Sequence, residues 1–203
     1  MQVLTLASHV AGCPDNRQQA GSRKPGAVLP SSSMPSPLGH ALGGAAVGLM
    51  AGRLPSASWR IPVALGVIAC LPDLDLIAGQ HSGMTHSIGF VAIAGIVSYL
   101  GSRSGRFALA AAAAYGSHLL FDWLGLDTAP PLGIMALWPF DDSFYMSPWT
   151  PLPPVSRRYW LPGFWTHTMK VALIELILFG GILAAAVVMR RRSSQVSRTE
   201  ADT

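Results

Sequence analysis

The chain has few charged residues, which make up 12% of its 203 positions. A soluble domain of average composition carries roughly twice that fraction, so the deficit argues against an ordinary soluble domain. Half of the residues are hydrophobic, and the length suits a single domain. Together these features indicate a small membrane protein.

Cysteine and clustered positive charge are also scarce. The two cysteines are Cys13, in a polar stretch, and Cys70, in an apolar one, so neither a disulfide framework nor a cysteine zinc site is expected. The one basic run, residues 190–192, directly follows an apolar segment and indicates a membrane anchor. The sequence contains no nucleic-acid-binding motif and no glycine-rich phosphate loop, so we expect no nucleic-acid partner.

Residues 1–33 differ from the rest of the chain. They are polar, rich in proline, glycine and serine, and without periodicity, which predicts a disordered tail. Their basic residues follow the short apolar stretch "VLTLA" rather than precede it, which argues against a signal peptide, and Met34 is an alternative start. We therefore expect a membrane-embedded domain over residues 34–190 and a polar cytoplasmic tail over residues 191–203.

Five apolar segments follow this tail. They cover about residues 38–52, 61–78, 84–101, 106–126 and 168–189. A spanning helix needs about 20 residues, with a range of about 17–25. The last two segments exceed 20 residues, whereas the first three are shorter than that. Pro72 should end or kink the second segment and leave an extended or turning chain behind it. The predicted fold class is an all-α, multi-span helical bundle in which glycine- and alanine-rich segments pack closely.

Basic residues in the short connections predict the orientation of this bundle. Arg53 and Arg60 follow the first segment, Arg103 and Arg106 follow the third, and the run at 190–192 follows the fifth. If all five segments cross the membrane, these three basic connections fall on the same side of it. The positive-inside rule predicts that this side is cytoplasmic. We therefore expect a multi-pass protein with its C-terminus in the cytoplasm.

The acidic and histidine residues between positions 35 and 189 all fall on the opposite, non-cytoplasmic face in this arrangement. Ionisable groups inside apolar segments are costly, and they persist when they are paired, hydrated or bound to an ion. Eight of them form a predicted polar cluster at that face: His40, Asp73, Asp75, His81, His86, His118, Asp122 and Glu175.

The residue types of this cluster point to a metal site. His118 and Asp122 are four residues apart, which places them one turn apart on one helix face. Imidazole and carboxylate ligands together suit zinc, manganese or iron. Eight groups exceed the needs of one tetrahedral ion, so either two ions bind or some groups orient the ligands or act as a general base. Single members also allow simpler interpretations: Asp73 as a helix cap, the His118–Asp122 pair as a structural hydrogen bond, and Glu175 as the partner of Lys170.

Four motifs carry a family resemblance: "LPDLD" at 71–75, "HSGMTHS" at 81–87, "SHLLFD" at 117–122 and "PLGIMALWPF" at 131–140. In order and spacing they closely resemble the YdjM-type family of bacterial inner-membrane, metal-dependent hydrolases, over about residues 34–190. The resemblance implies that activity and that location. The positions that match the family's motifs are Asp73, Asp75, His81, Thr85, His86, Ser87, His118, Asp122, Trp138 and Pro139. One departure is Ser82, which stands where the family commonly has an arginine that could hold an anionic group.

We predict a membrane-bound hydrolase that cleaves an ester or phosphoester, of a lipid or a small molecule, with water activated by a divalent metal. One or two ions are expected, with zinc favoured over manganese. The predicted metal ligands are Asp73, Asp75, His86, His118, Asp122 and His40. The predicted catalytic groups, as ligands or as general base, are His81 and Glu175.

A protein that is not an enzyme is the alternative. The same groups could bind or conduct a metal ion or protons, or a degenerate family member could keep a metal for stability. A pathway needs polar groups in both halves of the bilayer, whereas the cytoplasmic halves of four segments consist almost wholly of Gly, Ala, Val, Ile and Leu. This favours a site on one face. The sequence leaves the substrate, the number of ions and the oligomeric state open.

Overall fold

The computed structural model describes residues 36–54, 58–78, 82–127, 130–152, 160 and 162–201. Within these ranges the chain forms α-helices, two 3-10 helices and no strand: α1 (Pro37–Ala51), α2 (Arg60–Cys70), η2 (Leu71–Ala78), η3 (Met84–His86), α3 (Ile88–Ser102), α4 (Gly105–Trp123) and α5 (Phe164–Ala201). The all-α prediction is confirmed, with one helix for each predicted apolar segment. The predicted tail over residues 1–33 lies outside the described residues.

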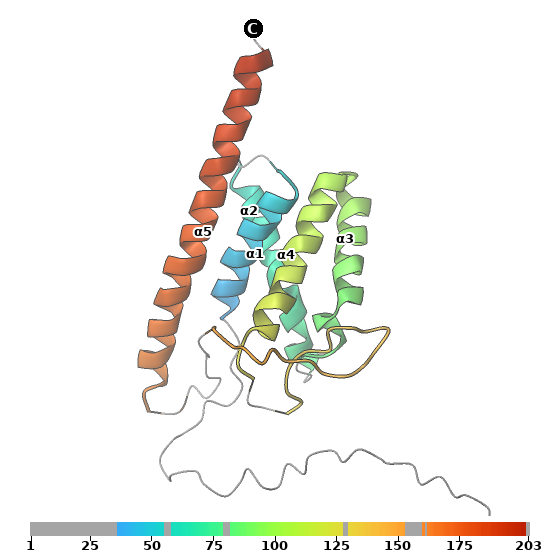
Figure 1. Cartoon of the computed structure of the whole chain (residues 1–203), viewed down its shortest axis with the longest axis vertical. Helices are drawn as coiled ribbons and strands as arrows, with labels where there is room; N and C mark the ends of the chain where they lie inside the picture. The colour runs from blue at the N-terminus through green and yellow to red at the C-terminus, as the bar shows by residue number, and fades with distance from the viewer. Residues whose placement is uncertain are drawn as a thin grey trace, which may run out of the picture.

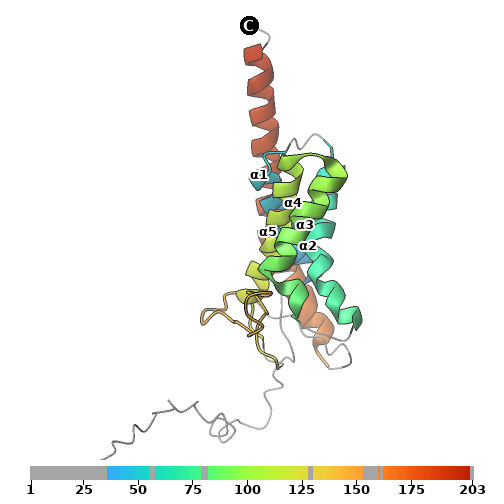
Figure 2. The ribbon, with the colours of Figure 1, turned by 90° about the vertical axis from the view of Figure 1, so that its right-hand side faces the viewer.

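The helices form a bundle whose members alternate in direction (Figure 1). Helices α1, α3 and α5 run one way, and α2 and α4 run the other. Helix α1 packs against α2, α4 and α5, whereas α3 packs against α4, which places α3 at one side of the bundle and α5 at the other (Figures 1 and 2). The connection from 130 to 152 lies across the end of the bundle where α1 and α3 begin and where α2 and α4 end. That end contains the candidate site.

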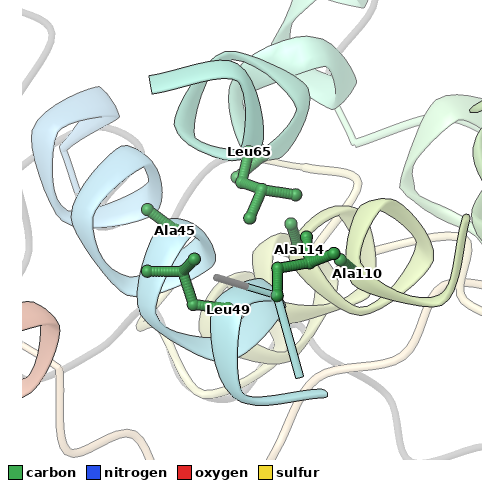
Figure 3. Close-up of a cluster of buried hydrophobic side chains, with 7 residues drawn as sticks. Ala45, Leu49, Leu65, Ala110 and Ala114 are labelled. Atoms are coloured by element: carbon green, nitrogen blue, oxygen red, sulfur yellow. The ribbon is translucent and has the colours of Figure 1, made fainter. Parts of the chain in front are cut away.

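Small residues allow α1 to approach its neighbours closely. A side-chain carbon added at Gly44 would lie 2.2 Å from the Cβ of Ala69 in α2, and one added at Gly48 would lie 2.8 Å from the carbonyl oxygen of Ala110 in α4. Leu49 and Leu65 are fully buried beside these contacts (Figure 3). This bears out the prediction of close packing through glycine and alanine for the first and fourth segments. The same prediction for the fifth segment does not hold at its glycines, since a Cβ at Gly180 would lie 3.6 Å from its nearest neighbour and one at Gly181 would meet nothing within 4 Å.

Helix boundaries follow local sequence signals. Ser36, Ser87 and Ser104 are the N-caps of α1, α3 and α4, and each side chain accepts a hydrogen bond from the backbone N–H three residues on. Helix α2 ends at Cys70, as the proline at 72 predicts. The expectation of an extended or turning chain after Pro72 is wrong, because η2 continues as a 3-10 helix to Ala78. The fixed φ of Pro72 suits a 3-10 turn as well as the start of an α-helix.

One described helix is both long and apolar enough to cross a membrane, over Phe164–Ser193 in α5. Helices α1 and α3 are apolar but have 15 residues each, which rise about 22 Å against a hydrocarbon core of about 30 Å. Both α3 and α5 expose large apolar side chains, among them Ile96, Val97, Leu173 and Ile177. The multi-span arrangement therefore stays a prediction beyond α5.

The two ends of the bundle differ in charge. At the end away from the candidate site, the Arg190 guanidinium of α5 donates hydrogen bonds to the backbone carbonyls of Arg53 and Leu54, just after α1. Arg106 lies beside that turn, since its carbonyl oxygen is 2.5 Å from a Cβ built at Gly52. Arg53, Arg106 and Arg190, which contribute to the predicted orientation, thus lie together at this end.

Candidate metal centre

Four side chains from three segments converge at the opposite end of the bundle. They are Asp73 of η2, His86 of η3, and His118 and Asp122 of α4. Each offers one ligand atom, and these four atoms all lie within 4.8 Å of one another. We call this set the four-residue centre.

Its three buried members form a compact triangle of ligand atoms. The Nε2 atoms of His86 and His118 are 3.2 Å apart. The Oδ2 atom of Asp122 lies 3.2 Å from the first nitrogen and 3.1 Å from the second. The Oδ1 atom of Asp73 is more distant, at 3.9 Å from His86 Nε2 and 3.6 Å from His118 Nε2.

Local structure places each of these side chains. His118 and Asp122 share one face of α4 at a spacing of one turn. Asp73 follows Pro72 in the first turn of η2, directly after α2 ends. His86 is the last residue of η3 and precedes Ser87, the N-cap of α3.

Burial of the four-residue centre is uneven. The side chains of His86, His118 and Asp122 are at most 1% exposed, whereas that of Asp73 is 24% exposed. The centre is therefore open to its surroundings on the side of Asp73.

Outer hydrogen bonds fix which nitrogen of each imidazole faces inward. The Nδ1 atom of His118 lies 2.7 Å from the carbonyl oxygen of Ala69. A carbonyl only accepts, so Nδ1 carries the hydrogen and Nε2 presents its lone pair to the centre. The Nδ1 atom of His86 lies 3.1 Å from Oδ2 of Asp75, so Nδ1 carries a hydrogen, and in the neutral ring Nε2 presents its lone pair to the centre.

Asp75 acts on His86 from outside the four-residue centre. Its Oδ2 atom accepts hydrogen bonds from the backbone N–H of Gly83 and the hydroxyl of Thr85, both at 3.1 Å. The Thr85 hydroxyl oxygen also lies 3.2 Å from His86 Nδ1. Asp75 thus holds the turn that carries His86, in the arrangement of a carboxylate that orients a ligating histidine. Its role as a direct ligand stays a prediction.

His40 supports the centre from α1. Its Nε2 atom lies 3.1 Å from Oδ1 of Asp122, and its ring stacks on that of His118 with centroids 3.8 Å apart. The side chain is buried, and its Nδ1 atom has no hydrogen-bond partner among the described residues. His40 therefore contacts the outer oxygen of Asp122 and limits the movement of two members of the centre.

The four residues fit a divalent cation. The buried Asp122 carboxylate faces imidazole nitrogens: His40 Nε2 lies 3.1 Å from Oδ1, and the Nε2 atoms of His86 and His118 lie 3.2 and 3.1 Å from Oδ2. Two inward lone pairs and a carboxylate oxygen 3.1–3.2 Å apart repel one another. Ligand atoms bound at about 2.0–2.1 Å around a tetrahedral ion lie about 3.3 Å apart, so the observed spacing suits such an ion. One added proton shared by the imidazoles would also relieve the repulsion.

A family model described as YdjM inner membrane protein matches residues 34–193. The chain belongs to this family. The matched range contains the whole four-residue centre, and it confirms the resemblance drawn from the motifs. No curated protein and no solved structure matches the chain significantly.

The YdjM-type motifs meet in space although they are far apart in sequence. The "WPF" loop lies on the N-terminus of α3, where the carbonyls of Ala136 and Trp138 accept hydrogen bonds from the N–H groups of Ile88 and Gly89. A Cβ at Gly89 would lie 2.9 Å from the Trp138 carbonyl oxygen. This loop therefore holds the helix that begins two residues after His86.

The same loop is closed by its own hydrogen bonds. The backbones of Ile134 and Tyr145 pair with each other at 2.8 and 2.9 Å. The hydroxyl of Tyr145 donates to Oδ2 of Asp141 at 2.5 Å. This hydrogen bond raises the pKa of Tyr145 and lowers the pKa of Asp141.

Ser82, the departure from the YdjM-type pattern, is fully buried and has a φ of 55°. Its carbonyl oxygen accepts a hydrogen bond from the N–H of Met135 in the loop. It tethers the turn before η3, and its uncharged side chain supplies no positive charge for an anionic group.

Of the two predicted catalytic groups, the structure places Glu175 outside the four-residue centre. Glu175 of α5 is 2% exposed, and it accepts hydrogen bonds from the backbone N–H of Ser36, at 2.8 Å, and from the Ser36 hydroxyl. It thus binds the N-terminus of α1, a favourable place for a carboxylate, instead of pairing with Lys170. Its catalytic role stays a prediction. His81 lies outside the described residues.

Sequence reasoning missed two contributors to the site. The carbonyl of Ala69 fixes the ring of His118, and no side-chain pattern signals a backbone group. The Tyr115 hydroxyl donates to the carbonyl of Thr85 at 2.7 Å. Tyr115, His118 and Asp122 recur at spacings of three and four, so their shared helix face was a usable signal.

Proposed function

We propose that this protein is a metal-dependent hydrolase of the membrane that cleaves an ester or phosphoester. The observation that carries the proposal is the four-residue centre, in which two imidazole lone pairs and a buried carboxylate face one another within 3.2 Å. Asp73, His86, His118 and Asp122 would hold a divalent cation. Such an ion supplies the Lewis acidity that activates water and polarises a scissile bond.

The chain's own residues would prepare the centre for this chemistry. Asp75 and the Ala69 carbonyl hold the two imidazoles in the inward-facing tautomer, and His40 contacts the second oxygen of Asp122. Support of this kind typically changes metal affinity or activity 10- to 100-fold. The exposed edge of Asp73 admits substrate while the other members stay dry.

The ligand set favours one zinc ion. Two nitrogen and two oxygen ligands suit tetrahedral zinc, and manganese is the second candidate. The convergence of four ligand atoms supports one ion, with Asp75 and His40 as orienting residues rather than ligands of a second ion. His81 is the proposed general base, since Glu175 is engaged with Ser36.

The proposed setting is a bacterial inner membrane crossed several times, with the centre at the non-cytoplasmic face and residues 191–203 in the cytoplasm. The family membership supports the membrane, and the basic residues around Arg190 at the far end support the orientation. A substrate at this depth would be a membrane lipid or a small molecule from the outer side.

The second candidate function is metal or proton binding and transport. The close pair of His86 and His118 beside Asp122 favours it, because the three could share one added proton. Against a pathway, the bundle core beyond the centre is formed by apolar residues, among them Leu49, Leu65 and Ala110. A degenerate enzyme with a structural metal would keep the ion and lack turnover.

The test is hydrolysis by the purified full chain of fluorogenic carboxylic esters and phosphodiesters, with zinc or manganese added and after chelation. We expect turnover that chelation abolishes, that Asp122→Asn removes and that Asp142→Asn, at an exposed loop acid, leaves intact. Bound metal without turnover on any substrate would support the structural-metal alternative. Turnover that survives chelation would contradict a metal-dependent mechanism.

A further inference from the structure

An apolar groove runs along α2 toward the four-residue centre. It has a volume of about 610 Å³ and is walled by α1, α2, η2 and α5. The residues that define its course are Leu42, Val63, Val67, Leu71, Leu74 and Leu183. No charged side chain of the described residues lines it.

One end of the groove lies beside η2, the segment that carries Asp73. Leu71 and Leu74, which line that end, lie on either side of Asp73 in the sequence of η2. Asp73 is the member of the centre that is exposed, at 24%. A molecule in the groove therefore places one end beside the side chain through which the centre is reached.

The size and surroundings of the groove suit a hydrocarbon chain. Its volume lies within the range of about 300–1,000 Å³ typical of ligand sites. Helix α2 has 11 residues and rises about 16 Å, and one leaflet of the hydrocarbon core is about 15 Å deep. Val63 and Val67 on its outer wall are more than half exposed, so in a membrane the groove opens to lipid.

We infer that the groove binds one acyl chain of a membrane lipid and presents the ester or phosphoester of that lipid to the centre at Asp73. This rests on the proposed hydrolase function and names its substrate class as a glycerolipid. The proposal commits to a lipid rather than a second copy of the chain, because the groove ends beside η2, which carries Asp73, and its lining side chains are uncharged and mostly apolar.

The test is photolabelling of the full chain in vesicles of phosphatidylethanolamine and phosphatidylglycerol. The probe is phosphatidylethanolamine with a diazirine in the middle of one acyl chain, and labelled peptides are mapped by mass spectrometry. We expect the label to concentrate on residues 59–74 and around Leu183. Val67→Trp, which fills the groove, should lower this labelling about tenfold, because it displaces several buried methylene groups.

Val97→Trp is the matched control, since Val97 of α3 is 62% exposed and Val67 is 59% exposed. Val97→Trp should leave groove labelling unchanged, and Val63→Trp repeats the block at a second position if Val67→Trp does not fold. Labelling spread evenly over α2, α3 and α5, or labelling unaffected by both blocking variants, would overturn the inference. So would a cross-linked dimer that protects the groove from the probe.

The variant Asp122→Asn separates the two proposals. It should lose hydrolysis while groove labelling stays within about twofold, since the groove lies outside the centre. Groove labelling by a protein that hydrolyses nothing would support the lipid site and count against the hydrolase. Hydrolysis together with a label spread evenly over the helices would support the hydrolase and count against the lipid site.

Discussion

The Nδ1 atom of His118 lies 2.7 Å from the carbonyl oxygen of Ala69. This contact joins α4 to the last turn of α2, and it turns the other nitrogen of the ring toward His86. On the other side of the centre, the Asp75 carboxylate lies 3.1 Å from the outer nitrogen of His86. Two groups that are not members of the four-residue centre therefore set the direction of both its imidazoles.

The role of Asp75 can be tested with Asp75→Asn. The amide keeps the size of the side chain but weakens its hydrogen bonding to the outer nitrogen of His86. We expect zinc affinity to fall about 10- to 100-fold, measured by competition with a chromophoric chelator. Asp142→Asn should leave affinity unchanged. Complete loss of binding with intact folding would instead indicate that Asp75 is a direct ligand.

Glu175→Ala should destabilise the protein without removing the metal. The substitution leaves the N-terminus of α1 at Ser36 without its buried acceptor, at a cost of about 1–3 kcal/mol. Thermal unfolding in detergent measures this cost, and the chelator competition should give an unchanged zinc affinity. Unaltered stability together with lost turnover would restore Glu175 as a catalytic group.

Helix packing at α1 predicts a contrast between two glycines. Gly48→Ala should destabilise by about 1–3 kcal/mol, because its Cβ would lie 2.8 Å from the carbonyl oxygen of Ala110. Gly181→Ala, in α5, meets nothing within 4 Å and should stabilise the helix by about 0.5–1 kcal/mol. Thermal unfolding of both variants measures the contrast, and equal effects would contradict the close approach of α1 and α4.

The proposed membrane orientation predicts which reporter fusions are active at each position of the chain. A fluorescent protein fused after residue 203 should fluoresce in cells, and alkaline phosphatase fused there should stay inactive. Alkaline phosphatase inserted after Asp142, in the connection near the centre, should be active. Replacing Arg190, Arg191 and Arg192 by glutamine should weaken this preference. The opposite reporter pattern would place the centre in the cytoplasm.

Hydropathy predicted the helices because each apolar run is long enough to show where it begins and ends. It also predicted that the acidic and histidine residues gather at one end of the bundle. In helices of alternating direction, the start of one helix and the end of the next lie at the same end, whatever their packing. The spacing of His118 and Asp122 predicted their shared face directly. These features depend on local periodicity, which one sequence records.

The roles of Asp73 and Asp75 could not be assigned in the same way. They are two residues apart and follow a proline, so their directions depend on η2 being a 3-10 helix, which no periodic pattern indicated. Asp75 turns toward Gly83 and Thr85, while Asp73 turns toward the centre. The partner of Glu175 is equally non-local, since Ser36 lies 139 positions away.

The metal content of the purified protein shows whether the four-residue centre binds a divalent cation. The full chain, purified in detergent without chelator, is compared by elemental mass spectrometry with an Asp73→Ala/His118→Ala double variant whose folding is checked by circular dichroism. We predict about one equivalent of zinc or manganese per chain, and less than roughly a tenth of that in the variant. Absence of metal from both proteins, even after incubation with divalent ions, would contradict the account and leave the centre as a proton-binding network.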